Sequence, residues 1–155
     1  MLDDFRNKIE ALRRYDFQAE QEQAVADNAD QIPPMVREQL ASGRDGAGER
    51  SRIFDKTEYS PKTIEIKESE GVGLGAVTDF VTNYMTGAFY ESLRAQVEGP
   101  VFEMESDVPY FGDIRLYSSD ALLDMNLEHR RQFAIEYTMP AVKQSFLQKT
   151  GFVIT

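Results

Sequence analysis

Few side chains of this sequence combine the reactivity and the spacing that catalysis requires. The chain has a single histidine, His129, and no cysteine, so it offers no thiol nucleophile, no thiolate zinc site and no histidine pair for a metal. No serine stands in the G-x-S-x-G motif that would partner His129 in a catalytic triad. We therefore expect His129 to be an exposed residue in the first turn of a helix capped by Asn126.

Carboxylates are plentiful, and Glu103 and Glu105 form a pair whose spacing could serve acid–base chemistry. In a β-strand, side chains two positions apart lie on the same face, roughly 7 Å apart. Such a pair is catalytic only in a cleft that raises the pKa of one carboxyl group, and no feature of the sequence indicates a cleft. The pair is more typical of an acidic strand that faces solvent or a channel.

Gly71, Gly73 and Gly75 form a glycine cluster that invites comparison with nucleotide-binding loops. Their spacing is not G-x-G-x-x-G, and no Lys-Ser pair follows them as a P-loop requires. The cluster therefore predicts a flexible connection. We expect no cofactor and no metal site in the chain, and we expect that it is not an enzyme.

Composition narrows the function classes further. The chain has 155 residues, 17 of them basic and 27 acidic, which gives a net charge of -10. This length fits one domain, or one domain with a helical arm, and the acidic balance argues against tight binding to nucleic acid. No apolar run approaches the roughly 18 residues of a membrane span, and the acidic start at Asp3 and Asp4 does not fit a signal peptide. We expect a soluble protein made inside the cell.

The first 42 residues are predicted to form an N-terminal helical arm. Apolar residues recur at three- and four-residue steps over residues 2–14, at Leu2, Phe5, Ile9 and Leu12, as expected for an amphipathic helix. A second helical stretch, residues 17–42, is interrupted by Pro33 and Pro34, so we expect a kink or two helices. Its narrow apolar stripe predicts a subunit interface through Val25, Ile32, Val36 and Leu40.

The remaining elements predict an α+β fold. Residues 43–76 are expected to form an extended loop or insert with a weak strand at 63–67, and residues 77–155 an α+β core with a C-terminal helix. Alternation over 93–98 and 101–106, around a turn at Gly99, predicts a β-hairpin, to which residues 109–117 are expected to add a third strand. The prediction is a small antiparallel sheet, a hairpin plus one or two further strands, packed by the N-terminal and C-terminal helices. Pro140 is expected to bend or split the last helix.

A short motif connects the sheet to the segment before it. The hydroxyl of Thr86 is predicted to cap a short helix, and Gly87 to allow a tight entry into it. Phe89 and Leu93, four positions apart, would anchor this helix to the sheet. These residues supply a scaffold and no reactive group.

Read in order along the chain, these motifs resemble a pattern found in the small tail-completion or head-tail connector proteins of tailed bacteriophages. The pattern has a Thr-Gly step, spaced hydrophobic residues, a serine, a strand pair and then Pro-Tyr, which correspond here to Thr86, Gly87, Phe89, Ser92, Leu93, Pro109 and Tyr110. Residues 37–48 and 127–131 are also similar to segments of small virion proteins from phages of Bacteroides-type hosts. The sequence departs from the pattern at Pro33 and Pro34, which lie within what is often a continuous helix, and at the long insert 49–77.

The resemblance implies a structural virion protein that is assembled in the cytoplasm of the bacterial host. It would form a ring at the neck, with copies of itself and with portal, neck or tail proteins as partners, and with no membrane contact. DNA would pass through the ring without specific binding, and Glu103 and Glu105 would line an acidic lumen. Two alternatives are a small intracellular adaptor that binds one partner through its N-terminal helices and, without a supporting motif, a hydrolase that uses paired carboxylates.

Overall fold

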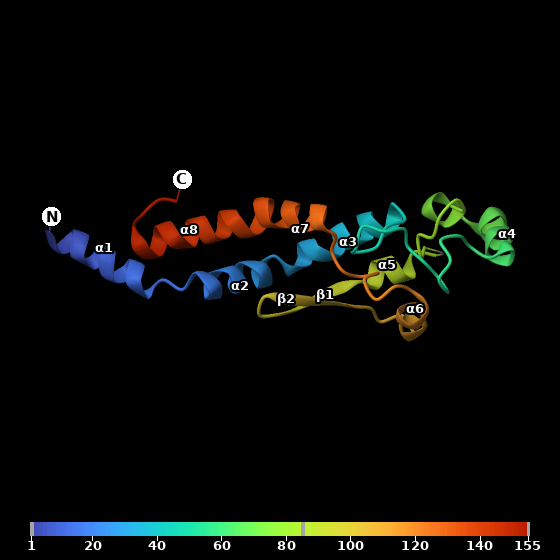
Figure 1. The fold of residues 1–155 in the computed structure, drawn as a ribbon, viewed down its shortest axis with the longest axis horizontal. Helices are drawn as coiled ribbons and strands as arrows, with labels where there is room; N and C mark the ends of the chain where they lie inside the picture. Colours follow the sequence, from blue (N-terminus) through green and yellow to red (C-terminus); the bar gives the residue numbers. More distant parts are fainter. Residues whose placement is uncertain (1, 85, 155) are drawn as a thin grey trace.

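The computed structural model describes residues 2–84 and 86–154 and shows an elongated molecule (Figure 1). Helix α1 (Leu2–Arg14) lies at one end and helix α4 (Pro61–Glu70) at the other. The N-terminal and C-terminal helices run side by side along half of this length, because α8 (Met139–Thr150) contacts both α1 and α2 (Phe17–Asp27). The sheet and the shorter helices fill the part between these helices and α4.

The N-terminal helices follow the predicted pattern. Asp16 caps α2 by accepting a hydrogen bond from the Ala19 amide at 3.1 Å. A 3-10 turn (Ala29–Gln31) then separates α2 from α3 (Ile32–Ala41), which has Pro33 in its first turn, where the missing amide proton costs no helical hydrogen bond. The prediction of two helices around the proline pair is confirmed.

The C-terminal helix is also divided as predicted. Helix α7 (Leu127–Phe133) is capped by Asn126, whose side chain accepts a hydrogen bond from the His129 amide at 2.9 Å. A π-helical turn (Ala134–Thr138) follows, and α8 begins with Pro140 in its first turn. The widened turn accommodates the backbone where proline cannot donate a hydrogen bond.

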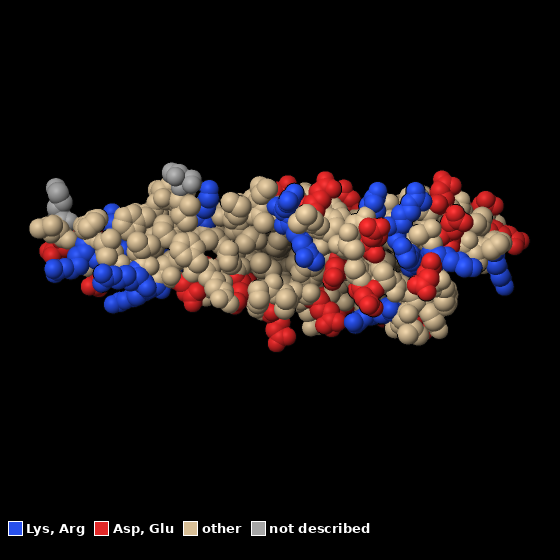
Figure 2. Space-filling model, viewed as in Figure 1, with Lys and Arg blue, Asp and Glu red and all other residues tan. Residues whose placement is uncertain are grey.

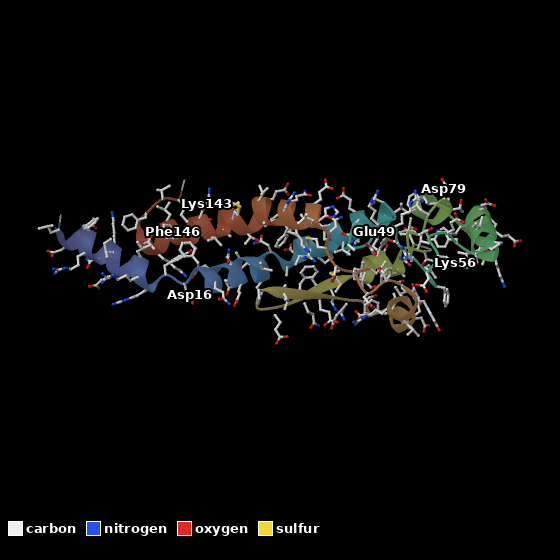
Figure 3. All side chains as sticks on the ribbon, viewed as in Figure 1. Asp16, Glu49, Lys56, Asp79, Lys143 and Phe146 are labelled. Carbon is white, nitrogen blue, oxygen red and sulfur yellow. The ribbon has the colours of Figure 1, made fainter. Side chains whose placement is uncertain are left out.

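An aromatic cluster and an ion pair join α8 to the N-terminal helices. The ring centroid of Phe146 lies 5.0 Å from that of Tyr15 and 5.4 Å from that of Phe17, at the joint between α1, α2 and α8 (Figure 3). Ser145 and Lys149 both donate to the carboxylate of Glu20, which lowers the pKa of Glu20 below its ordinary value. These contacts fix the N-terminal helices against α8.

The predicted β-hairpin is confirmed. Strands β1 (Arg94–Glu98) and β2 (Val101–Glu105) pair antiparallel, with Val97 opposite Phe102, and Gly99 takes the positive φ of 60° that the tight turn requires. The predominantly helical chain with this small antiparallel sheet, packed by N-terminal and C-terminal helices, confirms the α+β prediction.

The predicted third strand is wrong. The described residues form a two-stranded sheet, and the segment after β2 forms helix α6 (Phe111–Tyr117). Val108, Phe111 and Ile114 are the partly buried residues that pack this segment on the core. Their three-residue steps match a helical face, whereas a strand would turn successive residues to opposite sides.

The segment at residues 43–76 is not an extended loop throughout. The predicted strand at 63–67 is wrong, because these residues lie inside α4, and a 3-10 turn (Gly73–Ala76) follows it. The hydroxyl of Ser60 accepts a hydrogen bond from the Thr63 amide at 3.2 Å, and Pro61 occupies the first turn. This start signal outweighs an alternation of only two isoleucines.

The core lies where α3, the hairpin, α5 (Ala88–Ser92), the segment before α7 and the end of α7 meet. Ile32, Val36 and Leu40 have an exposed fraction of 0%, and Val25 packs partly buried against them. The prediction that this stripe is a subunit interface is therefore wrong, because the chain covers the stripe itself. The predicted arm at 1–42 likewise includes a core helix, α3.

Candidate functional site

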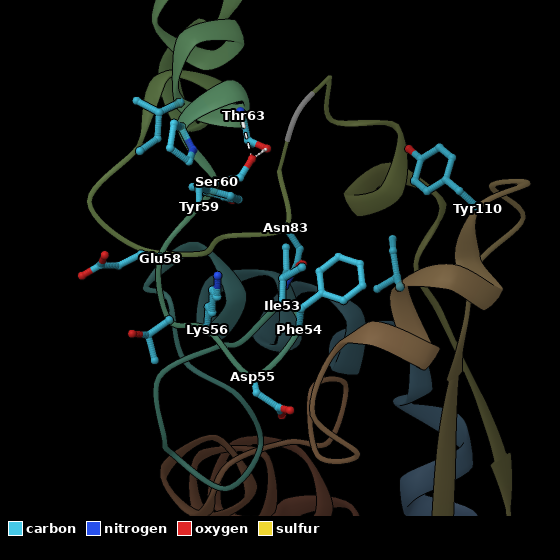
Figure 4. Close-up of a pocket in the computed structure, with 14 residues that line it drawn as sticks. Ile53, Phe54, Asp55, Lys56, Glu58, Tyr59, Ser60, Thr63, Asn83 and Tyr110 are labelled. Atoms are coloured by element: carbon cyan, nitrogen blue, oxygen red, sulfur yellow. Dashed lines mark hydrogen bonds between the residues drawn. The ribbon is translucent and has the colours of Figure 1, made fainter.

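An open groove lies near the end of the molecule that carries α4 (Figure 4). Its volume is about 980 Å³, within the range of pockets that hold large apolar ligands. Residues 53–64 form one side, and Asn83, Tyr110 and Ile114 belong to the facing segments. The apolar lining comes from Ile53, Phe54, Pro61, Ile64, Tyr110 and Ile114.

Backbone conformations with positive φ concentrate around this groove. The described residues include three non-glycine residues with positive φ, Phe54 at 51°, Asp55 at 61° and Asn83 at 56°, and all three line the groove. Phe54 and Asp55 form the centre of a tight turn in which the Ile53 amide donates to the Lys56 carbonyl at 2.9 Å. Positive φ at a bulky residue is strained and tends to persist at functional positions. The turn leaves the Phe54 side chain exposed at the groove.

A buried polar network adjoins the groove through Tyr59. The Tyr59 hydroxyl accepts a hydrogen bond from the Thr82 amide at 2.9 Å, and the Tyr90 hydroxyl donates to the Thr82 carbonyl at 2.5 Å. Burial raises the pKa of Tyr90, and nearby Tyr59 and Tyr84 raise it further. Tyr90 therefore stays a neutral donor, and the network holds the chain around Thr82 in place.

Lys67 on α4 is a buried cation within the same network. Its exposed fraction is 1%, its ammonium group donates to the Tyr84 carbonyl at 2.7 Å, and the nitrogen lies 4.7 Å from the centre of the Tyr59 ring. Burial lowers the pKa of Lys67 below its ordinary value of 10.5. Among the described residues, no carboxylate and no nucleophilic side chain accepts a hydrogen bond from this ammonium group. Its contacts therefore serve to anchor α4.

The substitution Lys67→Met should reveal this lowered pKa in the pH dependence of stability. The folded protein binds fewer protons than the unfolded chain as the pH rises toward 10.5, so the contribution of Lys67 to stability increases with pH. We expect the free energy of unfolding of the natural chain, minus that of Lys67→Met, to rise with pH in denaturant titrations. A difference that stays constant with pH for Lys67→Met would contradict the expectation.

A second, smaller cavity brings together part of the motif predicted from the sequence. It has a volume of about 280 Å³ and is lined by Thr86, Gly87, Phe89 and Tyr110, together with Asn83, Tyr84 and Tyr90. Asn83 and Tyr110 also line the groove, so the two cavities adjoin. The buried side-chain nitrogen of Asn83 has no hydrogen-bond partner among the described residues.

The roles predicted for this motif are partly confirmed. Phe89 and Leu93 are both 3% exposed and anchor α5 in the core, and Gly87 has a positive φ of 92°. The predicted capping by Thr86 is wrong, because Gly87 itself occupies the position before α5 and no side chain caps this helix. A Cβ atom at residue 87 would lie 2.8 Å from the Tyr84 hydroxyl, so the close approach also requires glycine.

Ser92 and Pro109 lie outside the two cavities. The Ser92 hydroxyl forms a hydrogen bond with the Ser106 hydroxyl at 2.5 Å, which ties α5 to the residue after β2. Pro109 is exposed at the start of the segment that leads into α6. Both residues therefore shape the scaffold around the groove without lining it.

The hairpin acids are not the free acidic surface that the sequence suggested. Glu103 lies 3.2 Å from Arg115, and Glu105 lies 3.7 Å from Arg94, which also pairs with Asp107. The alternation is confirmed, since Met104 between them is buried. The two arginines reduce the negative potential of this face, and sequence spacing alone could not place them there.

His129 and the titratable groups elsewhere form no reactive cluster. The His129 side chain is 12% exposed, with its Nε2 atom 3.8 Å from Glu38, so the prediction that it is exposed is wrong. It lies beside α3 because α7 packs on the core. Within residues 2–84 and 86–154, no three His, Cys, Asp or Glu side chains gather as a metal site, and no helix is long and apolar enough to cross a membrane.

The groove is the candidate site that sequence reasoning missed. Its walls come from the segment 53–64 and from Asn83, Tyr110 and Ile114, which are separated along the chain. The helix-start signal at Ser60-Pro61 is the local pattern that could have directed attention there. Comparisons with known protein families, with curated proteins and with solved structures find no match.

Proposed function

We propose that the chain is a non-enzymatic structural protein of a tailed bacteriophage virion, which forms a ring at the head-tail connector. The observation that carries the proposal is the grouping of the phage-like motif into one unit. Thr86, Gly87, Phe89 and Tyr110 surround one cavity, and Ser92 is tied to the end of the hairpin. The Ser92 hydroxyl bonds to Ser106 and to the Phe89 carbonyl and so holds the scaffold together, which supports a structural role.

The elongated shape further supports a ring subunit. Copies that contact one another through different surfaces close into rings when the rotation between them is suitable. Such a protein would be assembled in the bacterial cytoplasm with portal, neck or tail proteins as partners. The hairpin with Glu103 and Glu105 is the proposed lumen side, where paired arginines leave only a modest repulsion of passing DNA.

A copy count in purified phage particles tests the proposal. Quantitative mass spectrometry, calibrated against the portal protein of the same particles, should find about 6 to 12 copies of this chain per particle, as a single axial ring requires. Immunogold labelling should place them at the neck. The absence of the chain from particles whose other neck proteins are all detected would contradict the proposal.

One observation favours an adaptor as the second candidate. Helix α1 has no buried residue, and Leu2 and Phe5 on it are 86% and 58% exposed, so α1 is available to a partner protein. The N-terminal helices cannot all serve the partner, because α3 is buried in the core. An adaptor would lose its partner when residues 2–14 are removed and would be missing from virions.

A further inference from the structure

Helix α1 presents an apolar face whose first turns the chain leaves uncovered. Leu2, Phe5 and Leu12 are 86%, 58% and 38% exposed, and they fall on one side of the helix at the spacing that a helix uses to enter an apolar groove. Helix α8 packs on the later part of α1, where Ile9 on the same apolar face is half-buried and Lys8 approaches Gly151. The first two turns of α1 are therefore free to contact another molecule.

The groove near α4 is lined mainly by apolar side chains. Its lining includes Ile53, Ile64 and Ile114, and Phe54 is 63% exposed beside them. A volume of about 980 Å³ accommodates more than one large side chain. The groove and α1 lie at opposite ends of the elongated molecule (Figure 1), so α1 of the same copy cannot fill it.

Charge also favours a contact between these two surfaces. Helix α1 has four basic and three acidic residues, a net charge of +1, so the remaining 13 basic and 24 acidic residues of the chain carry a net charge of -11. Arg6 and Arg13 follow the edge of the apolar face of α1, and neither forms an ion pair among the described residues. The groove lining carries Asp55 and Glu58 against one cation, Lys56. Basic side chains are visible around α1 in Figure 2.

We propose that the groove binds α1 of a second copy of this chain, with Leu2 and Phe5 inserted beside Phe54. Each copy then offers a helix at one end and a groove at the other, which is a head-to-tail contact that continues until it closes into a ring. This contact would be the subunit contact of the proposed ring, so the ring itself rests on the proposed function.

Complementation between two variants of the full chain tests the contact. Phe5→Asp disables the helix, and Phe54→Asp disables the groove; Phe54 is exposed and aspartate tolerates positive φ, so folding is preserved. We expect sedimentation velocity to show each variant associating at least about tenfold more weakly than the natural chain. An equimolar mixture should form a one-to-one dimer, because one intact helix and one intact groove remain. Ile135→Asp, equally exposed at 65% on another face, is the matched control and should associate normally.

Every outcome of this experiment is decisive. A natural chain that stays monomeric up to about 1 mM, a Phe54→Asp variant that associates normally, or a mixture that does not dimerise would overturn the contact. Association is expected to weaken at higher salt, because Arg6 and Arg13 of one copy lie near Asp55 and Glu58 of the next in this contact. The copy count in virions is measured separately. A ring in virions without this contact would mean that the ring uses other surfaces, and this contact without the chain in virions would mean that only the proposed function is wrong.

Discussion

Leu40→Ala is expected to lower the free energy of unfolding by about 2–5 kcal/mol. Leu40 has an exposed fraction of 0% and lies in the core cluster together with Met125 and Phe133 of the C-terminal region. Truncation removes buried methyl and methylene groups and leaves a cavity that the surrounding side chains fill only in part. The effect is large because α3 lies inside the core. In a separable arm, the same substitution would have little effect on stability.

Urea titrations followed by circular dichroism measure this change. Leu116→Ala, on α6 with a side chain 70% exposed, is the matched control and should change the free energy of unfolding by no more than about 0.5 kcal/mol. If Leu40→Ala changed the free energy of unfolding as little as Leu116→Ala does, α3 would not belong to the core. The slope of the titration should stay the same for both variants, since neither changes the surface exposed on unfolding appreciably.

Gln39→Leu is expected to lower the free energy of unfolding by about 1–3 kcal/mol. The Gln39 side chain is 1% exposed; its nitrogen donates to the Asp124 carbonyl and its oxygen accepts from the Asn126 amide, both at 2.8 Å. Leucine has a similar size, so the main effect is the loss of partners for two backbone groups. These bonds hold α3 against the start of α7.

Gln18→Leu provides the control for this second substitution. Gln18 lies exposed on α2, where its side chain contacts Glu22 at 2.8 Å, and its replacement should have an effect within about 0.5 kcal/mol. Thermal unfolding and denaturant titrations should both find Gln39→Leu less stable than Gln18→Leu. A Gln39→Leu variant as stable as the natural chain would show that water replaces both hydrogen bonds.

Stability and self-association should therefore respond to different residues. Leu40 and Gln39 hold the central core together, whereas Phe5 and Phe54 are exposed at opposite ends of the molecule. Core variants are expected to unfold more easily, and end variants to keep their stability while losing association. This separation makes the head-to-tail contact testable in a folded protein.

Sequence periodicity was sufficient for elements that depend on local signals. The helix at residues 2–14, the division of the second helix at the proline pair, the hairpin around Gly99 and the cap at Asn126 all occur as predicted. In each case the deciding residues lie within one or two turns of one another. The strand at 63–67 was wrong because two isoleucines are too few to establish a period, whereas Ser60 and Pro61 start a helix.

Contacts between distant parts of the chain were beyond the reach of such patterns. An apolar stripe such as Val25, Ile32, Val36 and Leu40 must be buried, yet its spacing is the same whether the cover is a second subunit or the chain's own hairpin and α7. Arg115 neutralises Glu103, and residues 53–64 form a groove with Tyr110, only because the tertiary structure brings them together. The sequence by itself determined the N-terminal and C-terminal helices, the hairpin, the scarcity of reactive groups and the apolar face of α1. The tertiary structure decided which faces are covered, because burial depends on contacts between residues far apart in the chain.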